Sequence, residues 1–397
     1  MDGRLQHYCH KSVGKQADFS IVLTAVTVIR FSRRLINLER SYGMKRIFTL
    51  WGLVLILLLS GCQGLENKEV GQDRTLDIYF MDMMGGASTL IVTPMGESVL
   101  IDTGSLEPKH RDADRIHKAC MDAGLQQIDY LVTTHFDTDH YGGILELSKR
   151  IPVKCFIDND TPPKDITKRQ RYQKLNPLYE EATKGKTQLL RAGEDVPLKN
   201  DASGKIAPIK LHCVASQKKV EGFDGDIDAP MEGFDMARPH NSNNAASIAL
   251  VLNYGRFRLF AGGDVTLNVE HHLTRPVNRI GKVDLYQVTH HGLDMSNNPV
   301  LLKALEPTVC IAMNGPRKGI QPRTFGVLKG LKSVKAIYQI HYNTQYGDAG
   351  NTGAEFIANP KYNPDQGQYI KASVYPEKGV FTVRIGPDGL TKTYQIK

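Results

Sequence analysis

Short apolar runs alternate with glycine- and proline-containing turns along most of the chain. Runs of this length, rich in branched and aromatic residues, predict strands. A longer pattern with helical spacing covers residues 110–124, and further helices are predicted over 143–150 and 168–184. Because strands and helices interleave, the pattern predicts an α/β domain over 76–397. The strands are predicted over 76–81, 88–93, 98–101, 128–134, 152–158, 247–264 (two strands), 282–292 (ending on two histidines), 307–313 and 379–396 (a hairpin).

Polar side chains follow four of these apolar runs. Asp102 comes directly after the third predicted strand, and the sequence HFDTDHYGG begins at His135, where the fourth strand ends. Asp264 follows the strand pair at 247–264, and two adjacent histidines follow the next strand. In α/β proteins the ends of strands commonly build the functional site, so we expect these residues to converge.

The loop from His135 to His140 places two histidines and two aspartates within six positions. Taken alone, such a loop is also typical of turns and helix caps, because aspartate and threonine favour helix N-termini. Histidines and carboxylates gathered at several strand ends are typical of a metal site instead. Buried charge of this density is costly unless a cation compensates it. We interpret the two glycines that follow, Gly142 and Gly143, as letting the next helix begin close to the loop.

The first 75 residues have a different character. Residues 44–62 contain a basic pair, an apolar run and the sequence LSGC, which resembles a bacterial lipoprotein signal peptide with Cys62 as the lipidated residue. An ordinary cleaved signal or an uncleaved anchor is the alternative. Residues 1–43 then form a spurious or disordered extension, and 63–75 a flexible tether. We therefore expect an exported, membrane-anchored lipoprotein that faces the periplasm or the cell exterior.

The leader also accounts for most of the charge. The chain has a formal net charge of +8, of which residues 1–43 contribute seven basic and three acidic residues, and Lys45 and Arg46 add two more. About +2 remains for the rest of the chain, which is too little to indicate general nucleic-acid binding. A polar stretch near 159–210 has the composition of a surface insertion.

Four motifs, in this order along the chain, resemble the metallo-β-lactamase-fold hydrolase superfamily. They are SVLIDTGS, THFDTDHYGG, LFAGGD and VTHHG, and the resemblance covers most of residues 76–313. The stretches YFMDMMGGASTLIVTPMGESVLIDTG and NNAASIALVLNYGRFRLFAGGD are most similar to the competence-protein (ComEC-like) branch, which includes stand-alone exported members.

The resemblance implies an αββα sandwich, in which two mixed β-sheets lie face to face with helices on the outer faces. It also implies a centre for one or two divalent ions, zinc first and Mn²⁺ or Fe²⁺ as alternatives, that activates a hydroxide. Asp102 would hydrogen-bond to the histidine loop and orient it. Asp139, His140 and Asp264 would be the catalytic residues. The implied metal ligands are His135, Asp137, Asp139, His140, Asp264 and one histidine of the pair His290 and His291.

This chain departs from the superfamily pattern at two positions. Asp137 replaces a histidine, and a carboxylate is a harder ligand that shifts the preference away from zinc without excluding it. The third motif normally supplies a histidine where this chain has Asn243, and His240 is the nearby alternative.

Three functions remain open. The first is a metal-dependent hydrolase acting on a phosphodiester or on an ester, lactone or amide. The second is a β-lactamase, which the incomplete histidine set disfavours, and the third is a lipid-anchored scaffold with a degenerate metal site. The substrate is expected to be a small molecule or phosphodiester, for which Arg317 and Lys318 are candidate contacts. The sequence leaves the oligomeric state open.

Overall fold

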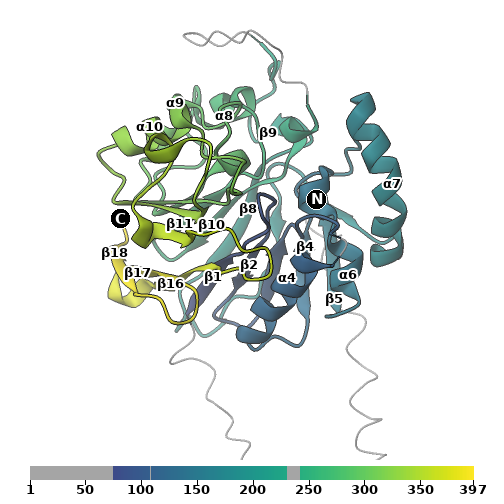
Figure 1. Cartoon of the computed structure of the whole chain (residues 1–397), viewed down its shortest axis with the longest axis horizontal. Coiled ribbons are helices and arrows are strands. Elements are labelled where there is room, and N and C mark those ends of the chain that lie inside the picture. The colour runs from purple at the N-terminus through teal and green to yellow at the C-terminus, as the bar shows by residue number, and fades with distance from the viewer. Residues whose placement is uncertain (1–74, 108, 230–241) are drawn as a thin grey trace, which may run out of the picture. The chain divides into compact units, whose positions relative to one another are not determined.

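The computed structural model describes residues 75–107, 109–229 and 242–397 (Figure 1). These described residues form a compact unit. The predicted extension, signal peptide, lipidated Cys62 and nearly all of the tether lie outside the described residues, as does His240. Within the described ranges, no helix is both long and apolar enough to cross a bilayer.

The first sheet has nine strands in the order β18-β17-β16-β1-β2-β3-β4-β5-β6. Its strands are parallel from β3 to β6 and antiparallel elsewhere. Both ends of the described chain contribute to this sheet. The strands are β1 (Leu76–Phe80), β2 (Thr89–Val92), β3 (Ser98–Ile101), β4 (Ile128–Val132), β5 (Val153–Asp158), β6 (Gln188–Leu189), β16 (Ile370–Tyr375), β17 (Val380–Ile385) and β18 (Lys392–Gln395).

The second sheet has the order β15-β14-β13-β12-β11-β10-β8-β7, with β9 paired to β8. It is parallel from β11 to β15 and antiparallel in the remaining pairs. The strands are β7 (Asp195–Val196), β8 (Ile209–Ser216), β9 (Lys219–Val220), β10 (Ala249–Tyr254), β11 (Phe257–Ala261), β12 (Leu285–Gln287), β13 (Val309–Ala312), β14 (Ala336–His341) and β15 (Ile357–Asn359).

The two sheets pack against each other through buried side chains. Phe257 of β11 and Phe381 of β17 meet edge to face, with ring centroids 5.4 Å apart. The Thr89 hydroxyl of β2 donates a hydrogen bond of 3.0 Å to Gln287 Oε1 of β12. Aromatic contacts of this kind bury large apolar areas, so the space between the sheets is one core of the domain.

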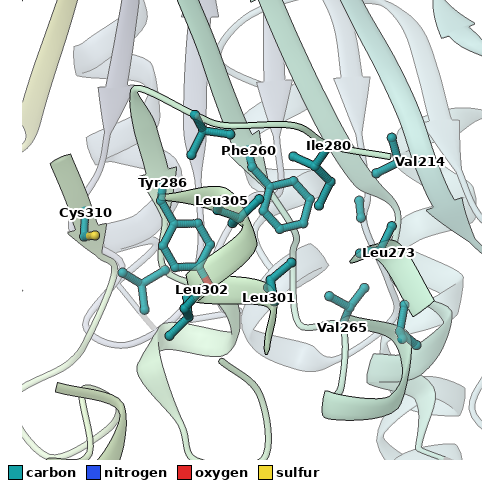
Figure 2. Close-up of a cluster of buried hydrophobic side chains, with 14 of the residues drawn as sticks. Val214, Phe260, Val265, Leu273, Ile280, Tyr286, Leu301, Leu302, Leu305 and Cys310 are labelled. Carbon is teal, nitrogen blue, oxygen red and sulfur yellow. The ribbon is translucent and has the colours of Figure 1, made fainter. Parts of the chain in front are cut away.

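Helices cover the outer face of each sheet, and Figure 1 shows α8, α9 and α10 gathered on one side. Figure 2 shows the core beneath those three, where Phe260 and Tyr286 lie among leucines of α9. On the other sheet, α4, α6 and α7 cover a second cluster around Leu100 and Leu131. The helices are α4 (Arg111–Asp122), α5 (Thr138–Tyr141), α6 (Ile144–Ser148), α7 (Ile166–Thr183), α8 (Leu267–Thr274), α9 (Pro299–Leu305) and α10 (Pro322–Gly330).

The predicted fold class is confirmed, because two mixed sheets with outer helices form the domain. The helix expected over 143–150 differs in detail, since a short helix, α5, already begins at Thr138 inside the histidine loop. The polar stretch 159–210 contributes more to the core than its composition suggests. Its helix α7 buries Tyr179 against the first sheet, and β6 and β7 each extend one of the two sheets.

We expect Phe381→Ala to lower the free energy of unfolding by about 3–5 kcal/mol, because the truncation leaves a cavity between the sheets. Urea denaturation followed by far-ultraviolet circular dichroism measures this change. Leu390→Ala is the matched control, since Leu390 is 89% exposed and its loss should change stability by less than about 0.5 kcal/mol. Equal effects of the two substitutions would contradict the packing described here.

Candidate metal centre

Four loops bring the predicted site residues together. They follow β3 and β4 of the first sheet and β11 and β12 of the second. Strands β3 and β4 are parallel, as are β11 and β12, so each pair releases its two loops at the same edge of its sheet. The resulting centre lies where these edges of the sandwich meet, and each sheet contributes half of it.

The tightest cluster joins Asp139, His140, Asp264 and His291. The Nε2 atoms of His140 and His291 lie 3.3 Å apart, and they lie 3.2 and 3.5 Å from Asp264 Oδ2. Asp139 Oδ2 lies 3.4 Å from His291 Nε2 and 3.9 Å from His140 Nε2. Ligand atoms about 2.1 Å from a tetrahedral zinc ion are about 3.4 Å apart, so these four side chains have the spacing of a metal site.

A second, looser cluster shares Asp264 with the first. His135 Nε2 lies 3.8 Å from Asp137 Oδ2 and 3.9 Å from Asp264 Oδ2. His290 Nε2 lies 3.3 Å from Asp264 Oδ2. Asp264 is therefore placed between the two clusters, and the adjacent histidines His290 and His291 divide between them.

Hydrogen bonds fix the orientation of the His135 and His140 rings. Asp102 Oδ2 accepts from the Thr134 hydroxyl at 2.8 Å and from His140 Nδ1 at 2.7 Å. Because the Thr134 proton points to Asp102, the Thr134 oxygen accepts from His135 Nδ1 at 3.1 Å. Both rings therefore carry their proton on Nδ1 and turn the Nε2 lone pair toward the centre.

The two histidines of the second sheet follow the same rule. His291 Nδ1 donates to the Met313 carbonyl at 3.1 Å. His290 Nδ1 donates to the Ser296 oxygen at 3.0 Å, since the Ser296 proton is used on the Val265 carbonyl. The Nε2 lone pairs of the four imidazoles thus point at one another and at carboxylates. Such an arrangement requires a cation.

His135 Nε2 gives the clearest sign of that partner. The atom is buried and has no hydrogen-bond partner among the described residues. An unsatisfied buried acceptor costs about 1–3 kcal/mol, and a bound cation removes this cost. The residues present therefore fit a divalent metal ion.

The electrostatics of the cluster lead to the same conclusion. Burial opposes ionisation of Asp264, but the histidines around it hold its pKa well below its usual range. Burial likewise opposes the charged form of His140, yet Asp264 and Asp102 raise the pKa of His140 well above its usual value. Burial lowers the pKa of His290 to about 4. The carboxylates thus attract positive charge to the centre. Most of the imidazoles there must stay neutral if they are to act as metal ligands.

The turn that presents the paired histidines has unusual backbone geometry. His290 and His291 both lie in the left-handed region, with φ of 54° and 56°. Gly319 packs against them so closely that a Cβ there would lie 2.1 Å from the His291 carbonyl oxygen. Two consecutive non-glycine residues in this region are strained, and strain of this kind is typical of functional sites.

Close backbone packing also explains the glycines after His140. A Cβ at Gly142 would lie 2.3 Å from the Leu106 nitrogen, and one at Gly143 would lie 2.3 Å from the Thr103 carbonyl oxygen. Both glycines therefore let the histidine loop and the segment after Asp102 touch directly. This contact, more than the start of a helix, is their structural role.

The region of the missing third-motif histidine contains two asparagines, Asn243 and Asn244. The side chain of Asn243 lies beside Asp137. Asn244 is the residue that reaches the centre, with its amide nitrogen 3.0 Å from His290 Nε2. The Asn244 oxygen accepts from Lys168 Nζ at 2.6 Å.

Lysines contact both partly exposed carboxylates of the centre. Lys168 of α7 forms an ion pair with Asp137, and Lys318 forms one with Asp139. Lys318 is one of the two substrate contacts expected from the sequence, whereas no local sequence signal points to Lys168 or Asn244. Both belong to polar stretches, and only the packing of the chain brings them to the histidine loop.

Comparison with protein families agrees with this geometry. Residues 82–201 match the model of the Metallo-beta-lactamase superfamily. This part of the chain is similar to that superfamily and contains the histidine loop from His135 to His140. The match agrees with the expectation of a metallo-hydrolase, and the histidine and aspartate groups fit a divalent cofactor without identifying the ion or the substrate. Among curated proteins, no sequence matches the chain significantly.

Comparison with solved structures finds similar proteins at low identity and low TM-score. A diphosphatase from the PhnP family is 14% identical, covering 66% of this chain and 94% of its own, with a TM-score of 0.33. MEM-A1, a subclass B3 metallo-β-lactamase from a soil metagenome library, is 15% identical, covering 62% and 78%, with a TM-score of 0.31. CmlA, a diiron β-hydroxylase from Streptomyces venezuelae, is 16% identical, covering 60% and 44%, with a TM-score of 0.33.

We expect Asp102→Asn to weaken zinc binding roughly 10–100-fold, because the amide has one acceptor oxygen, whereas the carboxylate accepts from the Thr134 nitrogen at Oδ1 and from the Thr134 hydroxyl and His140 Nδ1 at Oδ2. Competition with a fluorescent zinc chelator measures the affinity. Asp122→Asn is the control, since Asp122 pairs only with Lys118 on the surface of α4. Unchanged affinity in Asp102→Asn would show that Asp102 does not position the ligands.

Glu270 supports the segment that follows the paired histidines. Its two carboxylate oxygens accept from the backbone nitrogens of Asn297 and Asn298 at 2.9 and 2.7 Å. Complete burial raises the pKa of Glu270 from 4.5 to about 7. Between these two values the folded chain binds more protons than the unfolded chain, so stability is lost as the pH rises through this window.

We therefore expect the free energy of unfolding of the metal-free protein to fall between pH 5 and pH 8, with Glu270 contributing roughly 3 kcal/mol of the decrease. Urea denaturation at both pH values measures this. In Glu270→Gln the decrease should be smaller by that amount, because the glutamine does not titrate. The same decrease in both proteins would contradict the raised pKa.

Proposed function

We propose that the chain is a metal-dependent hydrolase that uses a metal-activated hydroxide on a phosphodiester or a related ester or amide bond. One observation carries this proposal. Four imidazole Nε2 atoms, each oriented by a hydrogen bond at Nδ1, converge on shared carboxylates, and His135 Nε2 has no partner among the described residues. The match of residues 82–201 to the metallo-β-lactamase superfamily model supports the same chemistry.

The proposed ligands form two sets that share Asp264. Asp139, His140 and His291 complete the tighter set. We assign His290 to the looser set with His135 and Asp137, because its Nε2 lies 3.3 Å from Asp264 Oδ2 and 3.0 Å from Asn244 Nδ2. Zinc fits the imidazoles best, while the Asp137 carboxylate also suits Mn²⁺ or Fe²⁺.

Ions bound in these two sets would lower the pKa of a water molecule, supply hydroxide at neutral pH and neutralise charge that develops on the substrate oxygen. The chain's own residues have three further tasks. Asp264 holds the two sets together, and Asp102 keeps the His140 lone pair directed inward. Asp139 remains one-quarter exposed, so its carboxylate can accept a hydrogen bond from an incoming water and orient it.

We further propose that the chain belongs to the competence-protein (ComEC-like) branch and acts outside the cytoplasm as a lipoprotein anchored through Cys62. The motifs and the signal-like sequence at 44–62 support this location. The low net charge beyond the leader favours a small substrate over long nucleic acids, since binding a polyanion requires many clustered cations.

A lipid-anchored scaffold with a degenerate metal site is the second candidate. The observation in its favour is Asn243, which stands at the third-motif position, with the further amide Asn244 beside it. A β-lactamase is disfavoured for the same reason, because the first ligand set lacks a histidine that such enzymes supply.

Metal content and activity together test the proposal. We expect the zinc-loaded full chain to contain two equivalents by elemental analysis and to hydrolyse bis(4-nitrophenyl) phosphate. His135→Ala should retain one equivalent, whereas Asp264→Ala should lose both ions and at least about a hundredfold in kcat/KM. His117→Ala, on the surface of α4, is the control. No bound zinc, manganese or iron in the unaltered chain would instead favour the scaffold.

A further inference from the structure

The two lysines at the centre occupy equivalent positions, one on each ligand set. The Lys168 ammonium contacts Asp137 and lies 2.6 Å from Asn244 Oδ1. The Lys318 ammonium contacts Asp139. The lysine side chains are 30% and 37% exposed, whereas the four histidine side chains are at most 6% exposed. The lysines therefore line the side of the centre that solvent reaches.

Both lysines are held in place by packing. Lys168 lies in the first turn of α7, where the Asp165 side chain accepts from its backbone nitrogen. Tyr172 and Tyr179 of the same helix pack edge to face on Phe136 of the histidine loop, each with centroids 5.4 Å from it. The position of Lys168 is thus coupled to that of the proposed ligands.

Lys318 is fixed by a tight turn. Gly315 and Lys318 form a two-residue bridge, with the Gly315 nitrogen 2.9 Å from the Lys318 carbonyl oxygen. A Cβ at Gly315 would lie 2.7 Å from the Met84 carbonyl oxygen, so the turn packs directly against the segment after β1. The backbone of each lysine is therefore held by packing next to the centre.

The charge balance shows what these lysines do once ions are bound. Asp102, Asp137, Asp139 and Asp264 carry four negative charges, which two divalent ions neutralise completely. The two lysine charges exceed the one negative charge of the proposed hydroxide, so the solvent side of the centre keeps a net positive charge. A neutral ester, lactone or amide cannot supply the missing negative charge, whereas a phosphate group can.

We propose that Lys168 and Lys318 form an anion-binding pair that restricts the hydrolase to phosphate-bearing small molecules. The proposal rests on the metal-dependent hydrolase described above and narrows its substrate class. Each ammonium donates charge-assisted hydrogen bonds to the non-reacting oxygens of the phosphate and holds the group over the centre. Lysine suits this task because its ammonium acts as a compact charge with three donors.

Binding of inorganic phosphate to the zinc-loaded full chain, measured by calorimetry, tests the pair without relying on turnover. We expect Lys168→Met and Lys318→Met each to raise the Kd for phosphate about tenfold, the worth of one charge-assisted hydrogen bond. Zinc content should stay at two equivalents in both. Lys154→Met is the matched control, because Lys154 lies on β5, outside the centre, and pairs with Asp129 of β4.

A kinetic measurement adds the specificity. The ratio of kcat/KM for bis(4-nitrophenyl) phosphate to that for 4-nitrophenyl acetate should fall about tenfold in each variant, because only the phosphodiester uses the lysines. An unchanged phosphate Kd in the variant that carries both Lys168→Met and Lys318→Met would overturn the proposal. It would also be overturned if the unaltered chain held one equivalent of zinc and Lys168→Met held two, since the lysine would then replace an ion.

The two hypotheses fail in different ways. If the unaltered chain hydrolyses the diester and the lysine variants match it in phosphate affinity and in rate, the hydrolase stands and the anion pair is wrong. If phosphate binds in a lysine-dependent manner but neither ester is hydrolysed, the anion pair stands and the proposed hydrolase is wrong.

Discussion

Mutual repulsion among carboxylates is the constraint on which this domain is built. Asp102, Asp137, Asp139 and Asp264 gather within one small region, and two of them are almost fully buried. Such a group is stable only if cations and hydrogen-bond donors surround it. The parallel strand pairs, the glycine contacts and the strained turn at His290 all hold these donors in place.

Much of the fold was predictable because its signals are local. Apolar runs gave the strands that flank the site, and a polar residue directly after a buried strand is visible without knowledge of tertiary structure. Asp102, Asp264 and the residues from His135 to His140 all have this property. The motif order then indicated how the strand ends meet.

The remaining parts of the site depend on packing that the sequence does not encode locally. Lys168 lies in a polar helix, and the packing of that helix, including the contacts of Tyr172 and Tyr179 with Phe136, brings it to Asp137. For a similar reason, the sequence alone could not assign His290 and His291 to the two proposed ligand sets. Their left-handed backbone directs His291 to one ligand set and His290 to the other, and a strand pattern cannot reveal such a turn.

The candidate ligands come from both halves of the sandwich. His135, Asp137, Asp139 and His140 follow a strand of the first sheet, while Asp264, His290 and His291 follow strands of the second. An ion bound between them is therefore a reversible cross-link between segments more than one hundred residues apart. Because a ligand that binds only the folded state stabilises it in proportion to the logarithm of its free concentration, the lifetime of this domain is coupled to the supply of metal in its surroundings.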